Sequence, residues 1–141
     1  MVGLHILVLG GTRFIGRACV AEFVERGAQV TLVSRRALPR HPNLRQHTMS
    51  REDYLLRPCK QSYDYVIDFI SYDERSLVDS LNNIRFKTYL FISSAWVPSL
   101  WGGSDSSEMR STIQISDAFP NKVSLDYVSG KWRAELAAVN W

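Results

Sequence analysis

The sequence predicts an α/β protein whose strands form one doubly wound parallel sheet. A short apolar run at residues 5–9 leads straight into a glycine-rich turn, and an amphipathic helix begins where the turn ends. Further apolar runs then alternate with helical patterns along the rest of the chain. Strands that alternate with helices favour parallel pairing, because each helix carries the chain back to the start of the next strand.

The N-terminal elements follow one another as strand, turn, helix and strand. Residues 5–9, His-Ile-Leu-Val-Leu, are typical of a buried parallel strand. In the helix, apolar residues recur at i, i+3, i+4 and i+8, and we expect this face to pack on the sheet; it consists of Ile15, Ala18, Cys19 and Phe23. Gly27 has the position of a helix C-terminal glycine, and the second strand is expected at residues 28–33.

The later elements are predicted from the same patterns, with less regular spacing. Strands are expected at 44–49, 65–70 and 89–92, a helical turn at 53–57, a short helix around Leu77, Val78 and Leu81, a loop at 98–121 and a helix at 127–139. The loop is rich in Ser, Gly and Pro, and the sequence shows no linker to a second domain.

Length and composition indicate a single globular domain spanning residues 1–141. Hydrophobic residues make up 45% and charged residues 22% of the chain, as in ordinary soluble domains. The net charge of +3 is spread along the chain, which does not favour a nucleic-acid partner. No apolar stretch reaches the ~20 residues of a membrane helix, so no membrane partner is expected.

Cysteine and acidic residues give no sign of a metal site. Cys19 and Cys59 lack the spacing of metal ligands, and two isolated cysteines suggest reduced thiols in a cytoplasmic protein. Asp64, Asp68 and Asp73 are interpreted as a solvated strand edge and a helix start.

The glycine-rich turn is the strongest functional signal in the chain. It consists of Gly10, Gly11, Thr12, Arg13, Phe14, Ile15 and Gly16. A pyrophosphate-binding turn needs glycine where φ is positive, where backbone approaches the phosphates and where the helix packs on its strand. The helix that follows presents free N–H groups and its positive dipole end. Because the turn follows a strand and opens a helix, it predicts an NAD(P) site rather than a purely structural turn.

The end of the second strand bears on which dinucleotide binds. NAD-specific proteins place an acidic residue there for the ribose 2′-hydroxyl, whereas this chain reads Ser34-Arg35-Arg36. A guanidinium suits a 2′-phosphate, and Arg13 could add a second positive contact. The alternative is that these arginines are only solvated loop residues. We expect NADP to be preferred over NAD.

A serine and a tyrosine–lysine pair suggest acid–base chemistry. Tyr127 and Lys131 are four residues apart and so share a helix face, and Ser94 follows an expected strand. A lysine ammonium near a tyrosine hydroxyl favours the tyrosinate, which can exchange a proton with a substrate hydroxyl during hydride transfer. Alone, a tyrosine–lysine pair is more often part of a surface helix.

Together these motifs resemble the short-chain dehydrogenase/reductase superfamily, in its extended branch of NAD(P)-dependent epimerases and dehydratases. The phrase GGTRFIG is similar to the turn of that branch, with Arg13 where many members have a middle glycine. The resemblance implies a Rossmann-type fold, places Ser94 on the catalytic Ser/Thr position, and places Tyr127 and Lys131 on the catalytic pair. The turn looks most like a subgroup that includes the chloroplast stem-loop RNA-binding proteins.

The chain departs from the family pattern in two places and in length. Phe69 and Ile70, which the resemblance implies as cofactor-lining residues, stand in a stretch where the family more often has His-Leu-Ala-Ala. The residues Met49-Ser50-Arg51 replace a common Gly-Asp-Arg near the adenine. Family members run on for roughly another 150 residues, so the chain is expected to stop before the substrate lobe.

Two functions are compatible with these observations. The first is an NAD(P)-dependent epimerase, dehydratase or reductase acting on a nucleotide-linked sugar or similar small molecule. The second is a non-catalytic NAD(P)-binding module, either a redox-sensing regulator or an RNA-associated protein. The oligomeric state is open, with a homodimer as one option.

Overall fold

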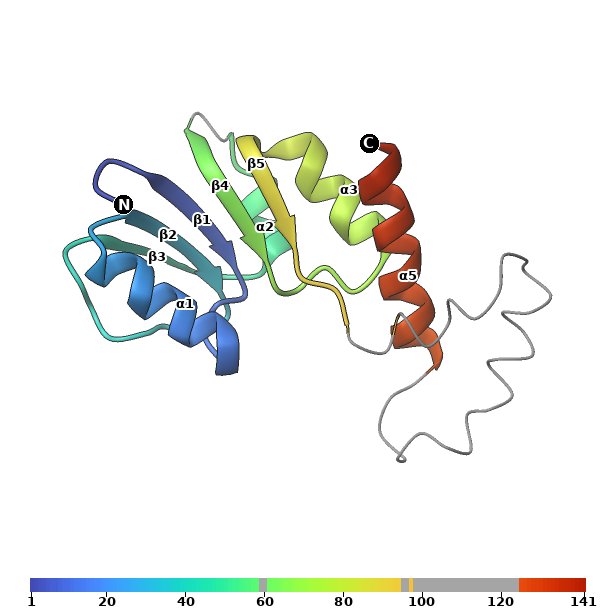
Figure 1. The fold of residues 1–141 in the computed structure, drawn as a ribbon, viewed down its shortest axis with the longest axis horizontal. Coiled ribbons are helices and arrows are strands. Elements are labelled where there is room, and N and C mark those ends of the chain that lie inside the picture. Colours follow the sequence, from blue (N-terminus) through green and yellow to red (C-terminus); the bar gives the residue numbers. More distant parts are fainter. Residues whose placement is uncertain (59–60, 95–96, 98–124) are drawn as a thin grey trace. The chain divides into compact units, whose positions relative to one another are not determined.

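A computed structural model describes residues 1–58, 61–94, 97 and 125–141 (Figure 1). The chain divides into two compact units. The first consists of Met1–Ile70 and Asp79–Ile92, and the second of Ser71–Val78 and Ser93–Trp141. The loop expected at 98–121 lies outside the described residues.

The first unit holds a five-stranded sheet in the order β3-β2-β1-β4-β5, and all of its strand pairs are parallel. Its strands are β1 (His5–Leu9), β2 (Gln29–Ser34), β3 (Leu44–Thr48), β4 (Ser62–Asp68) and β5 (Arg85–Phe91). Helices α1 (Phe14–Glu25) and α2 (Arg51–Leu55) belong to the same unit, and α3 (Glu74–Asn83) crosses the unit boundary. The predicted Rossmann-type α/β fold is confirmed.

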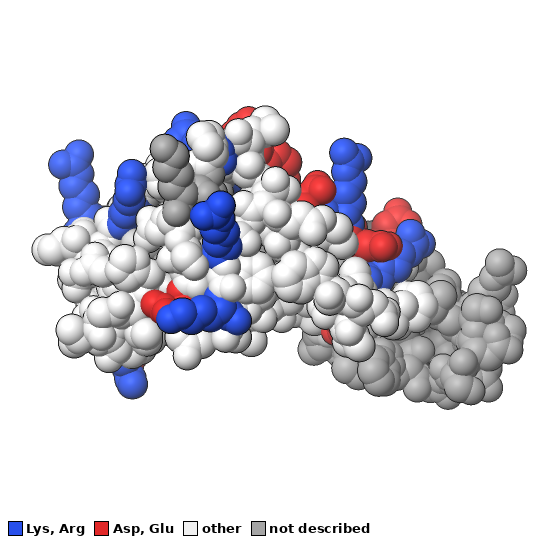
Figure 2. All heavy atoms as spheres, turned by 90° about the horizontal axis from the view of Figure 1, so that it is seen from above, with Lys and Arg blue, Asp and Glu red and all other residues white. Residues whose placement is uncertain are grey.

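Helix α5 (Leu125–Asn140) belongs to the second unit. No helix in the described part of the chain combines the length and the apolar character needed to cross a membrane. On the face drawn in Figure 2, the described Lys and Arg side chains stand mostly apart among uncharged residues.

The prediction for the buried face of α1 is wrong at two of its four positions. Ile15 is 70% exposed and Ala18 is exposed, whereas Gly16, Val20 and Val24 are buried. A Cβ built on Gly16 would lie 2.9 Å from the Cα of Gly11, so the helix turns this glycine toward the sheet. The buried stripe therefore runs at i, i+4 and i+8 from Gly16.

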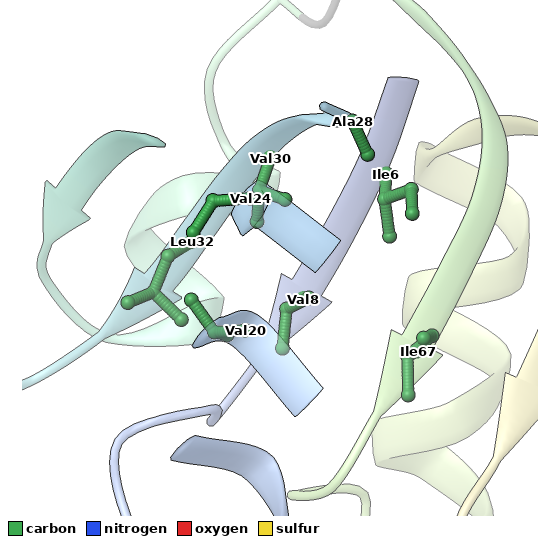
Figure 3. Packing of buried hydrophobic residues seen from close by; sticks show 8 residues of the cluster. All are labelled: Ile6, Val8, Val20, Val24, Ala28, Val30, Leu32 and Ile67. Carbon is green, nitrogen blue, oxygen red and sulfur yellow. The ribbon is translucent and has the colours of Figure 1, made fainter. Parts of the chain in front are cut away.

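The core lies on both faces of the sheet. Val20 and Val24 of α1 pack with Val8, Val30 and Leu32 of the central strands (Figure 3). The opposite face buries a second cluster that includes residues of α2 and β4; it consists of Leu7, Leu9, Val33, Tyr54, Tyr63, Val66 and Ile84. Apolar side chains on both faces of β1 explain its uninterrupted apolar sequence.

The boundaries of α2 and β4 differ from expectation near the expected site. Helix α2 begins at Arg51, before the expected 53, because the Ser50 hydroxyl accepts a hydrogen bond from the Asp53 N–H at 3.0 Å and caps the helix. Strand β4 begins at Ser62 and ends at Asp68, so Phe69 and Ile70 leave the strand at the carboxyl edge of the sheet.

Candidate functional site

The sheet has a topological switch point between β1 and β4. From β1 the chain moves through β2 and β3 to one side, while β5 extends the sheet on the other side of β4. In open α/β sheets, ligands bind outside the carboxyl ends of the strands at this point. The turn after β1 and the residues Phe69 and Ile70 after β4 both lie here, within the first unit.

The glycines of the turn are packed too closely to carry side chains. Gly10 has φ +84°, and a Cβ built on it would overlap the Cγ2 atom of Ile70. A Cβ on Gly11 would lie 2.6 Å from Val8 Cγ1, and one on Gly16 would lie 2.9 Å from the backbone of Gly11. The turn is held by a 2.9 Å hydrogen bond from the Gly10 N–H to the Val33 carbonyl.

The start of α1 presents backbone to the same place. Arg13, the N-cap residue, makes no capping hydrogen bond through its side chain within the described residues, and the first helical turn holds no acid. Phe14 has φ +43°, in the left-handed region, and its side chain is 91% exposed. The first N–H groups of a helix attract anions, especially when no side chain caps them. The start of α1 therefore has the charge and the uncapped backbone N–H groups that suit an anion.

Strand β2 ends at Ser34, and Arg35 and Arg36 follow in the bend after it. Ser34 is buried, and its hydroxyl donates to the Arg36 carbonyl. The Ser34 hydroxyl oxygen in turn accepts the Arg36 N–H at 3.3 Å. The serine thus shapes the turn through backbone contacts, which the sequence alone did not indicate. Arg35, Arg36 and Arg13 are exposed and keep their guanidinium groups accessible to a ligand.

Asp68 is a buried group that the sequence interpretation placed on a solvated edge, and this interpretation is wrong. Its side chain is 0% exposed. One carboxylate oxygen accepts the Ile70 N–H at 2.8 Å, and the other accepts the Tyr89 hydroxyl at 2.6 Å. An acid that directly follows the buried run Val66-Ile67 was the available signal for such a position.

Tyr127 and Lys131 lie on α5 and meet a third residue, Tyr72. The Lys131 ammonium is 5.2 Å from the centre of the Tyr72 ring, and the rings of Tyr72 and Tyr127 are 6.0 Å apart between centroids. Lys131 is only 1% exposed, so the aromatic face helps to accommodate its charge. Sequence reasoning missed Tyr72, because nothing in a single chain indicates which loop residue packs on a distant helix.

Ser94 also lies in the second unit. It is partly buried, and its carbonyl accepts the Val97 N–H at 3.0 Å. The residues predicted for catalysis, Ser94, Tyr127 and Lys131, thus share one unit, and those predicted for the cofactor share the other.

Comparison with known proteins gives a consistent result for family and fold. The family model described as "NAD dependent epimerase/dehydratase family" matches residues 6–97. An epimerase from Methanothermobacter thermautotrophicus is similar in structure, with TM-score 0.68 and 16% identity over 97% of this chain and 47% of that one. A sequence search of curated proteins gives no match.

Two further solved structures have the same fold. A UDP-glucose 4-epimerase from Thermotoga maritima gives TM-score 0.59 and 18% identity over 97% of this chain and 50% of its own. An enzyme from Bordetella bronchiseptica in complex with NAD gives TM-score 0.60 and 13% identity over 97% of this chain and 49% of its own. The chain spans about half the length of these structures. Because the family model matches well over half of its residues, the chain belongs to the NAD dependent epimerase/dehydratase family.

Proposed function

We propose that the chain binds a nicotinamide dinucleotide on the turn from Gly10 to Gly16. The observation that carries the proposal is the structure of this turn. Its three glycines have no room for a Cβ, and no described side chain caps the helix that follows. Family membership supports the same ligand, and the relative from Bordetella bronchiseptica was solved with NAD. The pyrophosphate would be held by the backbone N–H groups at the start of α1.

We propose further that NADP(H) binds more tightly than NAD(H). Arg35 and Arg36 follow the Ser34 turn with exposed side chains, and no acid stands there to repel a 2′-phosphate. Calorimetric titration of both cofactors tests this preference. Arg35→Ala should weaken NADP binding by about 1–3 kcal/mol, the size of a charge-assisted contact, and leave NAD binding nearly unchanged. Equal affinities of the wild type for both cofactors would contradict the preference.

For the reaction, we propose an epimerase, dehydratase or reductase that acts on a nucleotide-linked sugar. When bound, the nicotinamide supplies a hydride acceptor or donor. Ser94 would bind the reacting substrate hydroxyl, Tyr127 would exchange its proton, and Lys131 would favour the tyrosinate and orient the nicotinamide ribose. The packing of Tyr127 and Lys131 on Tyr72 supports the pairing of these two side chains. We place this activity in the cytoplasm because of the two isolated cysteines.

Tyr127→Phe tests the catalytic proposal. With NADP and UDP-glucose, and with a substrate lobe supplied on an extended chain, conversion of the sugar nucleotide, followed by chromatography, should be slower in the variant than in the wild type by ~100-fold, the usual scale for losing a positioned acid or base. The chain alone is expected to bind the cofactor with little or no turnover. Cofactor affinity should remain unchanged. Tyr65→Phe, at an exposed tyrosine of β4, is the matched control. Cofactor binding without any conversion of the sugar nucleotide by the extended wild type would favour the non-catalytic binding module.

A further inference from the structure

We propose that Asp68 and Tyr89 are positioning residues of the dinucleotide site, acting through Ile70. Together they fix the backbone of Ile70, whose side chain forms the wall against which the Gly10 turn is built. The inference rests on the proposed function, because it assigns a role within a site for the dinucleotide. All of the residues involved lie in the first unit.

Asp68 is the last residue of β4, and its backbone is held from both sides. Its carbonyl accepts the Ile92 N–H at 2.9 Å, and the next N–H, that of Phe69, donates to the Leu9 carbonyl at 3.0 Å. The side chain is fully buried, and its two oxygens accept hydrogen bonds from Ile70 and Tyr89. A buried carboxylate is costly unless donors such as these satisfy it.

Tyr89 supplies a donor that persists at neutral pH. Burial, reinforced by the negative charge of Asp68, raises the pKa of the Tyr89 hydroxyl far above its usual value. The hydroxyl therefore stays protonated and continues to donate to Asp68. Because Tyr89 lies on β5 and Asp68 on β4, this hydrogen bond ties the end of β4 to the neighbouring strand.

Ile70 transmits this constraint to the glycine-rich turn. The Asp68 carboxylate fixes its N–H, and its Cγ2 atom occupies the space that a Cβ on Gly10 would need. Phe69 extends the contact, since a Cβ on Gly16 would lie 3.4 Å from its ring. The residues after β4 therefore pack against Gly10 and lie near Gly16, the first and the last glycine of the turn. Because both Asp68 oxygens already have internal donors, Asp68 acts through Ile70 and not on a ligand directly.

The experiment measures binding to the intact chain with three probes that differ in the phosphate they carry. NADPH and ADP-ribose contain the pyrophosphate, whereas adenosine 2′-monophosphate has no phosphate on its 5′ position. Tyr89→Phe removes one hydroxyl and keeps the ring packing. Asp68→Ala removes both acceptors, and Asp68→Asn keeps an acceptor for the Ile70 N–H and a group to pair with Tyr89. Tyr63→Phe is the matched control, because it removes a buried hydroxyl that bonds Tyr54 at 2.8 Å.

Tyr89→Phe is expected to weaken the binding of NADPH and ADP-ribose by about threefold to tenfold, the effect of losing the hydrogen bond from Tyr89 to Asp68. Asp68→Ala should weaken the binding of both probes at least as much. The double variant with Tyr89→Phe should lose little further affinity. Asp68→Asn should restore most of the affinity. Adenosine 2′-monophosphate should bind every variant equally, and Tyr63→Phe should bind every probe like the wild type.

Two results would overturn the positioning role while leaving the proposed function intact. One is wild-type affinity for ADP-ribose in Tyr89→Phe. The other is an equal loss for all three probes that also appears in Tyr63→Phe and follows the urea unfolding midpoint, which would indicate a purely structural role. If the wild type binds none of the probes, the proposed function itself fails, and the positioning role fails with it.

Discussion

At Gly10, two separate demands exclude a side chain. The residue has φ +84°, a region that L-residues with a Cβ enter only at a cost, and Ile70 fills the space beside it. Only the backbone conformation excludes a side chain at Gly3, because it has φ +83° but nothing within 4 Å of a built Cβ. A comparison of Gly10 with Gly3 therefore separates the cost of backbone strain from the cost of close packing.

Gly10→Ala should lower the free energy of unfolding more than Gly3→Ala. The conformational cost, about 1–2 kcal/mol, is common to both variants, and only Gly10→Ala must also displace Ile70. Urea denaturation measures both changes. Equal losses would mean that Ile70 yields without cost and does not form a wall of the turn.

Phe14 has a left-handed backbone conformation, although it is not a glycine, the residue that tolerates this conformation. Its φ is +43° and its side chain is 91% exposed, so little packing offsets the strain. Phe14→Gly should therefore raise the free energy of unfolding by about 1 kcal/mol. Ile15→Gly, at the next and also exposed position, should instead lower it by up to about 1 kcal/mol. Loss of stability in Phe14→Gly, measured by urea denaturation, would show that the left-handed conformation is not strained.

The contacts of two residues, Ser34 and Asp68, could not be predicted from the sequence. Sequence reasoning singled out Ser34 as an uncharged residue at the position where an acid would bind the ribose, but the Ser34 hydroxyl bonds the backbone of Arg36. It treated Asp68 as solvated, because its partner Tyr89 is far away in sequence and only strand pairing brings the two together. Spacing along one chain reveals contacts within an element, whereas contacts between elements depend on register.

At the scale of elements, α5 is fitted to the segment after β4 through a glycine. A Cβ on Gly130 would overlap the carbonyl oxygen of Tyr72, a backbone atom that cannot move as a side chain can. Gly130→Ala should therefore destabilise the second unit, although the same change in an open helix would stabilise it by about 1 kcal/mol. Thermal unfolding followed by circular dichroism measures the change. Ala138→Gly, at an exposed position of α5, provides the ordinary helix cost for comparison; a gain in stability for Gly130→Ala would contradict the fitted contact.

Strand β3 and helix α2 bring a histidine into a positive environment. The His47 ring packs on Tyr54 with 5.2 Å between centroids. Burial, followed by the charges of Arg45 and Arg57, lowers the pKa of His47 below its usual 6.5. As the pH falls, His47 is protonated at a higher pH in the unfolded chain than in the folded chain. The stability that is present above about pH 6.5 therefore declines as the pH falls.

Acidification from about pH 7.5 to about pH 5.5 should lower the urea midpoint of the wild type. His47→Gln should lose part of this dependence, because its side chain does not titrate. His41→Gln is the control, since His41 is exposed. If the wild type and His47→Gln lose the same stability on acidification, His47 does not contribute to the pH dependence.

For the whole molecule, alternation of strands and helices was enough to predict the fold class. The apolar strands β1 and β2 were found almost to the residue, because each is buried on both faces. Strand β5 was predicted only for residues 89–92, although it begins at Arg85. Its first half carries exposed polar residues such as Lys87 and Thr88, and its pairing with β4 supplies the backbone hydrogen bonds that the sequence pattern cannot show.

Calorimetric titration of the intact chain with NADPH and NADH shows whether the turn after β1 binds a dinucleotide. Gly16→Val and Ala18→Val place the same side chain on α1, the first against the Gly11 backbone and the second at an exposed position. We predict that the wild type and Ala18→Val bind NADPH, and that Gly16→Val folds but does not bind, because its branched side chain separates the helix from the turn. Wild-type affinity in a folded Gly16→Val variant, or no binding by the wild type, would show that the turn after β1 is not a dinucleotide site.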